Sequence, residues 1–305
     1  MNEQLIIIEK MRRRVFWQFV VGLVLPFIII FGGIAILRSN PSGPIKYIFF
    51  AVLILAFFID FITGVKAHEK YRAYYKNHYI DAMIKSAIPD GKYQPDQGLP
   101  SAMISKTGLI MMGNVYQSED LITGTYNNVE FQRADVVIRD QTTDSEGHTQ
   151  TTTYFQGRWM VFESNKYFEA DLQIIQKGFG YAQKRTSFLV KEKYRRHAIE
   201  TEDMAFNKKF KCLCQNDQEA FYLLTPVMMQ GLMKLAAESD GKIMVGFVNN
   251  VIHVAIKSHK DSLEPPLFRR VSNKHIGEIQ REIHAVTSFV EEMRIDNKIY
   301  MQKKY

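Results

Sequence analysis

The chain has 305 residues, of which 46% are hydrophobic and 23% charged, a balance typical of folded proteins that excludes a disordered or collagen-like chain. Its formal net charge of +7 comes from 39 Lys and Arg against 32 Asp and Glu. Because dense basic clusters are lacking, this charge suits a negatively charged membrane surface better than a nucleic acid, and we expect no nucleic-acid partner. The two cysteines, Cys212 and Cys214, are separated by one residue, too few for an ordinary disulfide, which favours a reducing cytosol.

A basic N-terminus over residues 1–14 precedes an uncharged, apolar run over residues 15–37. At ~1.5 Å per helical residue this run is long enough to cross a hydrocarbon layer of ~30 Å. A short loop over residues 38–46, with two prolines and one glycine, leads to a second apolar run over residues 47–65. We therefore expect a transmembrane hairpin. A cleaved signal peptide is the alternative for the first run, but the apolar part is too long for one and no small-x-small cleavage site precedes the second run.

The positive charges around the two spans predict their orientation. Eight of them flank the hairpin on its terminal side, namely Lys10, Arg12, Arg13, Arg14, Lys66, Lys70, Arg72 and Lys76. The connecting loop holds only Arg38 and Lys46. Loops rich in Lys and Arg stay in the cytoplasm, so we expect a multi-pass protein of the cell membrane with both termini cytoplasmic.

Asp60 is an ionisable residue inside the second span. A charge in hydrocarbon is costly and marks a candidate for ion or proton handling. Asp60 lies only five residues from the basic flank, however, so reaching the interface or pairing with Lys66 or Lys70 is the simpler interpretation. Conduction by two spans with one acid would also require oligomerisation.

The segment after the second span has a helical pattern. Over residues 66–88, Tyr71, Tyr74, Tyr75 and Tyr79 recur at spacings of three and four, which predicts a juxtamembrane amphipathic helix. Its tyrosine face suits either the headgroup layer or packing against the rest of the protein. Prolines and glycines over residues 89–100 predict a linker, which leaves residues 101–305 as a cytosolic domain.

That domain alternates strand and helix patterns. Residues 121–140 and 149–164 are rich in Thr, Val, Tyr and Phe and predict β-hairpins with turns at Asn127-Asn128 and at residues 144–147. Residues 210–214 predict a strand, and a helix over residues 221–239 has Thr225 as its cap and Pro226 at its first position. Residues 241–258 predict a hairpin around Asn249-Asn250, and residues 274–297 a final amphipathic helix. The fold class is therefore α+β, with antiparallel β-hairpins and packed helices.

The order of these features resembles a bacterial membrane family, the domain-of-unknown-function family numbered 3137. The most specific part runs from Asp203 to Leu235, and its matching residues are Asp203, Phe206, Asn207, Phe210, Asp217, Ala220, Leu224, Thr225, Pro226, Met229 and Leu232. The resemblance is expected to cover nearly the whole chain. It implies N-terminal spans with a cytosolic domain, and genes found near those of LemA-type membrane proteins, so a LemA-type protein or a second copy of the chain is the implied partner. It brings no accepted activity and no catalytic residue.

The residues that could carry metal chemistry have simpler explanations. His275, Glu278, Glu282 and His284 do not share one helical face, which indicates a solvated polar surface. Cys212 and Cys214 point to one side of a strand, but two ligands do not complete a metal site. Unless a histidine such as His197 or His253 converges on them, we expect two ordinary buried thiols. No nucleotide-binding or hydrolase motif occurs, so we assign no catalytic, cofactor-binding or metal-binding residue.

The densest basic run comprises Lys191, Lys193, Tyr194, Arg195 and Arg196. At a negatively charged membrane such a run suits contact with anionic lipid, although a solvated loop is the commoner explanation.

These features together predict a non-enzymatic, membrane-anchored cytosolic scaffold or adaptor that binds a protein partner or lipid headgroups. One alternative is a membrane-bound enzyme of unrecognised type, with Asp203, Asn207 and Asp217 as candidates whose simpler roles are in turns and caps. The other is an oligomeric channel or transporter accessory subunit, which depends on Asp60.

Overall fold

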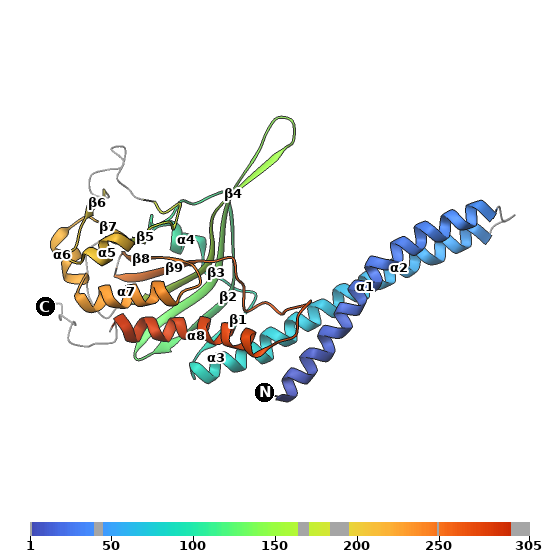
Figure 1. Cartoon of the computed structure of the whole chain (residues 1–305), viewed down its shortest axis with the longest axis horizontal. Coiled ribbons are helices and arrows are strands. Elements are labelled where there is room, and N and C mark those ends of the chain that lie inside the picture. Colours follow the sequence, from blue (N-terminus) through green and yellow to red (C-terminus); the bar gives the residue numbers. More distant parts are fainter. Residues whose placement is uncertain (1, 40–44, 164–170, 184–194, 249, 294–305) are drawn as a thin grey trace. The chain divides into compact units, whose positions relative to one another are not determined.

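The computed structural model describes residues 2–39, 45–163, 171–183, 195–248 and 250–293 (Figure 1). The chain divides into two compact units, which are described separately. Unit 1 comprises Met1–Ala82 and Ser262–Ile279, and unit 2 comprises Met83–Asp261 and Gln280–Tyr305. The chain first passes from unit 1 to unit 2 between Ala82 and Met83.

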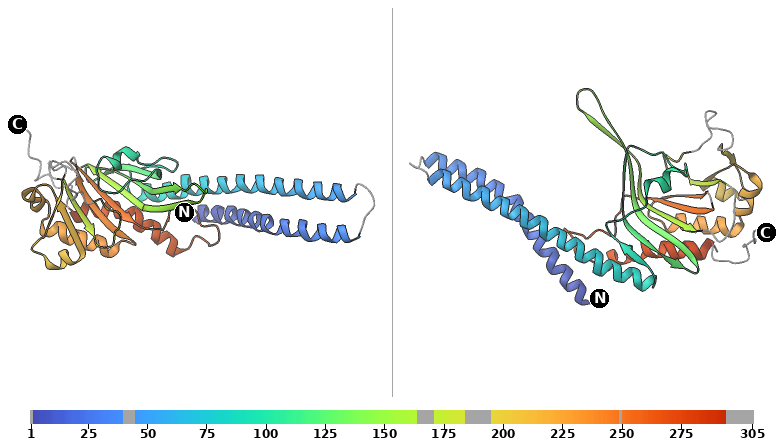
Figure 2. Two further views of the ribbon diagram at one scale, coloured as in Figure 1. Left: turned by 90° about the horizontal axis from the view of Figure 1, so that it is seen from above. Right: turned by 180° about the vertical axis from the view of Figure 1, so that it is seen from behind.

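Unit 1 is built around two long helices, α1 (Asn2–Ser39) and α2 (Ile45–Tyr74). They run side by side in opposite directions (Figures 1 and 2). A π-helical segment, η1 (Tyr75–Ile80), and α3 (Asp81–Ala87) continue directly from α2. Among the described residues, two helical stretches, Glu3–Ala35 and Phe50–Ala87, are long and apolar enough to cross a membrane.

The segment Ser262–Ile279 packs against the base of these helices within unit 1. Arg72 and the buried Lys76 both pair with Glu264. Three further hydrogen bonds, each of 2.8 Å, join the segment to the helices: Tyr71 Oη to the Pro266 carbonyl, Tyr75 Oη with His275 Nε2, and Arg12 Nη1 to the Leu267 carbonyl. Tyr71, Tyr75 and Tyr79 are fully buried, so packing within the protein occupies the tyrosine face.

Unit 2 contains an antiparallel sheet. Its described strands are β1 (Lys92–Gln94), β2 (Val115–Tyr126), β3 (Val129–Thr143), β4 (Thr149–Glu163), β5 (Leu172–Gln176), β6 (His197–Ile199), β7 (Phe210–Cys214), β8 (Lys242–Val248) and β9 (Val251–Lys257). Nine described strands lie in the order β1-β2-β3-β4-β9-β8-β5-β7-β6. Beyond the sheet, β3 and β4 continue as a two-stranded arm over residues 140–152 (Figures 1 and 2). The α+β fold class is confirmed.

Local turn chemistry sets the hairpins as the sequence predicted. Asn127 and Asn128 adopt positive φ angles of 49° and 62° in the turn from β2 to β3, the conformation that twists two strands correctly. Asn250, with φ of 63°, occupies the same kind of position between β8 and β9, where Val248 pairs with Val251.

The expected helix over residues 221–239 is two helices, α6 (Asp217–Leu223) and α7 (Pro226–Glu238), bent by 67°. Thr225 Oγ1 accepts the Met228 N–H at 3.2 Å, so it caps α7 as predicted. Pro226 has no N–H to donate back to α6, and the break follows from that.

Helices cover both faces of the sheet. The short helix α4 (Ser101–Ser105) contributes Ile104 to a buried apolar cluster with Trp159 and Val161 of β4. On the opposite face lie α7 and residues 280–293 of α8 (Asn273–Met293), where Phe289 stacks on Phe162 with ring centroids 4.7 Å apart. The expected end of this last helix at residue 297 lies outside the described residues.

Buried charges join α8 to the sheet. Glu282 accepts from Arg133 Nη2 of β3 at 2.9 Å and from Arg158 Nη1 of β4 at 2.7 Å. Arg133 also pairs with Asp135, and Arg158 with Asp240. The sequence placed Glu282 on a solvated polar face, and this is wrong: its side chain is 7% exposed, because the sheet brings two guanidinium groups beneath it.

Removing the Glu282 carboxylate is predicted to destabilise unit 2 strongly. Glu282→Ala leaves Arg133 and Arg158 short of a partner in the interior, which costs about 3–5 kcal/mol. Glu292→Ala on the same helix removes an exposed partner of Lys234 and should cost at most about 1 kcal/mol. In a Trp17→Phe background the buried Trp159 is the remaining tryptophan, so its fluorescence during guanidinium unfolding measures both effects. Equal losses in the two variants would contradict the prediction.

Candidate metal centre

Two members of the basic run, Arg195 and Arg196, belong to the described part of the chain. Arg196 is buried and donates to Asp171 and, at 2.8 Å from Nη1, to Gln173 Oε1. The lipid-contact expectation therefore does not hold for Arg196, because an interior carboxylate holds its charge. Arg195 is exposed, whereas Lys191, Lys193 and Tyr194 lie outside the described residues.

Asp60 lies in the seam between the two long helices of unit 1. A Cβ added to Gly22 of α1 would be 3.2 Å from Asp60 Oδ2, and one added to Gly64 of α2 would be 3.9 Å from Cβ of Gln18. These two close approaches lie one helical turn apart, so Gln18 and Asp60 both lie along the seam between α1 and α2. The carboxylate of Asp60 thus faces α1.

Two of the three enzyme candidates serve local structure. Asp203 caps α5 (Met204–Lys209), accepting the N–H groups of Ala205 and Phe206 at 2.8 and 3.0 Å. Asn207 Nδ2 donates to the Thr201 carbonyl at 2.6 Å, and its Oδ1 accepts from the Thr201 N–H at 3.0 Å. Cap and turn chemistry explains both residues.

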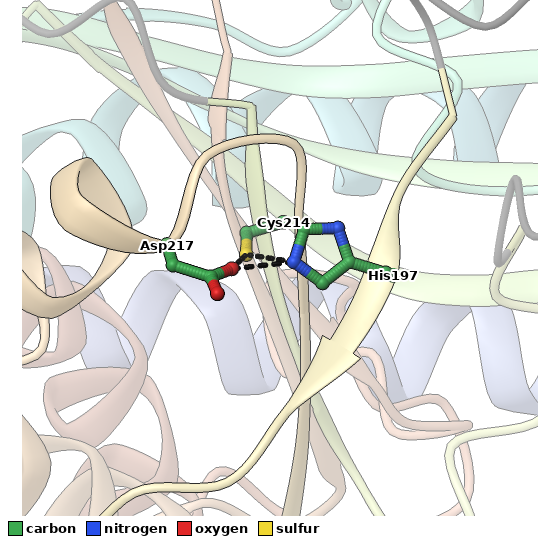
Figure 3. Close-up of side chains that lie close together, drawn as sticks. All are labelled: His197, Cys214 and Asp217. Carbon is green, nitrogen blue, oxygen red and sulfur yellow. Dashed lines mark hydrogen bonds and ion pairs between the residues drawn. The ribbon is translucent and has the colours of Figure 1, made fainter.

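The third candidate, Asp217, belongs to a cluster with His197 and Cys214 (Figure 3). His197 of β6 pairs directly with Cys214 of the neighbouring β7, so both side chains emerge on the same face of the sheet. His197 Nε2 lies 3.8 Å from Cys214 Sγ. A metal site at the cysteines needs a histidine that converges on them, and His197 does so at Cys214.

Asp217 completes the group from the start of α6. The turn between Cys214 and Asp217 carries Asn216, whose side chain caps α6 by accepting from the N–H groups of Gln218 and Glu219. This turn brings Asp217 Oδ1 to 3.5 Å from Cys214 Sγ and into contact with His197 Nε2. One ligand-type atom from each of the three residues thus lies within 4.8 Å of the other two.

A buried carboxylate holds the backbone on both sides of this cluster. Asp171 binds Arg196, the residue before His197, and its Oδ2 accepts from Nε2 of Gln215, the residue after Cys214, at 3.1 Å. The neighbours of two cluster residues are therefore tied to one group, which fixes the separation of β6 from the turn after β7.

The other possible metal ligands named from the sequence, Cys212 and His253, are not part of the cluster. Cys212 is opposite Ile199 in the register of β7 with β6. His253 on β9 is buried, and its Nδ1 accepts from Trp159 Nε1 at 3.2 Å. His197 and Asp217 could have been recognised only together, from the Cys-x-x-Asp spacing and a strand register that the sequence does not give.

The electrostatics of the cluster favour a neutral thiol in the absence of a cation. Burial, together with the hydrogen bond to Asp217, raises the pKa of Cys214 to about 12, and burial raises that of Cys212 to about 12. The hydrogen bond from His197 lowers the pKa of Asp217. A thiolate nucleophile is disfavoured by this environment, whereas a bound metal would replace the proton.

A second group of carboxylates, Asp120, Asp135 and Asp261, also clusters in unit 2. Arg133 Nη2 lies 3.1 Å from Asp135, and Arg133 Nη1 lies 3.5 Å from the Asp120 carbonyl. This group therefore already has a positive charge beside it, whereas no described Lys or Arg forms an ion pair with Asp217, so the His197–Cys214–Asp217 cluster is the better candidate for a cation.

Residues 153–295 match a family described as a protein of unknown function (DUF3137). The matched stretch covers just under half of the chain. The sequence resemblance is thereby confirmed, over a narrower range than the nearly complete coverage expected. No curated protein sequence matches the chain. A crystal structure of the mycobacterial trehalose monomycolate transport factor A is similar, with 9% sequence identity, a TM-score of 0.38, and coverage of 72% of this chain and 96% of that chain.

The two cysteines are predicted to be unreactive in the folded, chelator-treated protein. With pKa values of about 12 for both thiols, a negligible fraction is thiolate at pH 8. Incubation with iodoacetamide followed by mass spectrometry should therefore show no alkylation, and full alkylation of both residues after denaturation. Rapid alkylation of folded Cys214 would instead indicate an activated nucleophile.

His253 is predicted to make the domain sensitive to acid. Burial lowers its pKa from 6.5 to about 4, so the unfolded state binds the proton more readily and stability falls as pH drops from 6.5 to 4. The loss amounts to about 3 kcal/mol. Guanidinium unfolding at pH 7.5 and pH 4 should show a smaller loss for His253→Gln than for the natural protein. The exposed His259 provides the control, and a His259→Gln variant with the same reduced loss would refute the assignment.

Proposed function

We propose that this protein is a membrane-anchored scaffold whose hairpin holds the α+β domain at the cytoplasmic face of a membrane, where the domain binds a protein partner. The observation that carries the proposal is the apolar exterior of α1 and α2. Their most apolar windows are only 6% and 0% buried, so the rest of the protein does not cover them.

The exposed side chains of the hairpin suit hydrocarbon. Trp17, Phe31 and Phe61 are each more than 60% exposed. Leaving such surface in water costs about 25 cal/mol per Å², and contiguous apolar surface of this extent marks an interaction with a membrane or another protein. The length of both helices favours a membrane.

The cytoplasmic placement rests on the distribution of Lys and Arg, eight on the terminal side against two in the loop. Within unit 1, Arg12 pairs with Glu9, and Arg72 and Lys76 pair with Glu264. The orientation rule counts the basic residues themselves, since acidic residues contribute little to it, so these ion pairs leave the prediction unchanged.

The arm of β3 and β4 favours a protein partner over lipid. Every residue from 141 to 151 is exposed, although the strands remain paired as far as Thr143 with Thr149. The charged side chains over residues 140–157 are Asp140, Asp144 and Glu146, with no Lys or Arg among them. Anionic headgroups would repel this surface, whereas the strand edges offer backbone groups to a protein segment. Tethering at the membrane strengthens such a contact by raising the effective concentration.

The partner prediction is tested by purifying the full-length protein from native membranes in mild detergent and identifying what remains bound. We expect a stoichiometric protein, with a LemA-type membrane protein the first to look for, and a second copy of the chain the next. Replacing residues 142–150 by Asn-Gly joins the paired residues Gln141 and Thr151, which shortens the arm without shifting the register of β3 with β4, and should release the partner. Retention of lipid alone, with no protein at stoichiometric amounts, would overturn the scaffold proposal.

The predicted topology is tested by single cysteines in a Cys212→Ser, Cys214→Ser background. A cysteine at Ser42 in the hairpin loop should react with a membrane-impermeant maleimide in intact cells. A cysteine at Ser145 in the arm should react only after the membrane is opened. The reverse pattern would contradict the proposed orientation.

A further inference from the structure

We propose that His197, Cys214 and Asp217 bind one Zn²⁺ ion, with a fourth coordination position open to solvent. This site is independent of the scaffold role, since it lies in the sheet and requires neither the hairpin nor a partner.

The donor set selects the metal class. A thiolate, an imidazole and a carboxylate together suit zinc, whereas Mg²⁺ and Ca²⁺ prefer oxygen ligands throughout. Cys214 and Asp217 are separated by two residues, which is the spacing of paired zinc ligands in a tight turn. His197 reaches them from the adjacent strand, so the ligands come from two sequence-distant segments that the sheet joins.

The separations of the donor atoms fit a tetrahedral ion. Zinc bound to sulfur at about 2.3 Å and to nitrogen or oxygen at about 2.1 Å holds the sulfur about 3.6 Å from the other two donors. Cys214 Sγ lies 3.8 Å from His197 Nε2 and 3.5 Å from Asp217 Oδ1. His197 and Asp217 are in direct contact, and a cation between them would replace that contact with two coordinate bonds.

The backbone around the site is already in position. Asp171 ties Arg196 and Gln215, the neighbours of two ligands, and Arg196 also donates to Gln173 on β5. A site whose surroundings are held in this way loses little conformational freedom on binding the metal.

Exposure differs among the ligands in a way that leaves one side of the ion open. Cys214 is fully buried, whereas the side chains of His197 and Asp217 are 53% and 57% exposed. The ion would therefore lie at the surface with sulfur beneath it, and a water or a donor atom from another molecule would take the fourth position.

Binding releases a proton. The Cys214 thiol, which donates to Asp217 Oδ1 in the structure, forms a sulfur–zinc bond as its S–H bond breaks, and the proton passes to solvent. His197 binds as the neutral imidazole through Nε2, and Asp217 as the carboxylate.

The test uses the full-length protein in detergent, purified without a histidine tag and treated with a chelator. Titration with Zn²⁺ against a chromophoric competitor is expected to show one tight equivalent, accompanied by proton release. Substitution with Co²⁺ is expected to give a sulfur-to-cobalt charge-transfer band. His197→Gln, Cys214→Ser and Asp217→Asn, each made in the Trp17→Phe background, should lose the tight equivalent, and the fluorescence of Trp159 should show that the domain stays folded.

Cys212→Ser is the matched control, because it leaves Cys214 as the remaining cysteine and changes no ligand. It should keep both the equivalent and the cobalt band, which would assign the sulfur to Cys214 even if every ligand variant misfolded. Absence of a tight equivalent in the natural protein would overturn the proposal. So would a cobalt spectrum without the band, or an equivalent that folded ligand variants retain.

Discussion

The packing of α8 on the sheet depends on the carboxylate of Glu282. Strands β3 and β4 present Arg133 and Arg158 on the face that this helix covers, and both arginines are buried. A guanidinium group keeps its proton, and therefore its charge, even when it is buried. The helix that covers the two arginines must therefore place an acidic side chain beside them. With Glu282 above both groups, the rotation and register of α8 are restricted, and seven residues later Phe289 meets Phe162. Apolar packing alone would allow neighbouring registers; the ion pair selects one.

The same device recurs at the other end of the sheet with a different consequence. Arg196 enters the interior beside β6, and Asp171 neutralises it. Because Asp171 also binds Gln215, this one carboxylate sets the distance between the strand that carries His197 and the turn that carries Cys214 and Asp217. The candidate metal centre is thus a result of satisfying a buried arginine nearby. Arg196 belongs to the basic run that suggested lipid contact, but its charge is paired with Asp171 in the interior.

Features decided by a few adjacent residues could be predicted from the sequence. Asn127-Asn128 tolerates positive φ, and Thr225-Pro226 starts a helix, whatever the rest of the chain does. The burial of Glu282 could not be predicted, since its partners lie 149 and 124 residues away. The approach of His197 to Cys214 depends on the register of β6 with β7, and a shift of one residue would turn the histidine to the other face. Local sequence patterns therefore predict the helices, strands and turns, whereas ion pairs between residues far apart in the sequence decide how those elements are aligned.

The hairpin of unit 1 follows another rule because hydrocarbon provides no hydrophobic drive for two apolar helices to associate. Close approach and polar contacts must supply it. Gly22 and Gly64 lie where the helices meet, and each admits a polar residue of the partner helix, Asp60 and Gln18 respectively. The same arrangement keeps the two polar side chains of the seam away from lipid. Asp60 is thereby explained as part of the packing of α2 against α1, which is the contact that makes the two helices a hairpin.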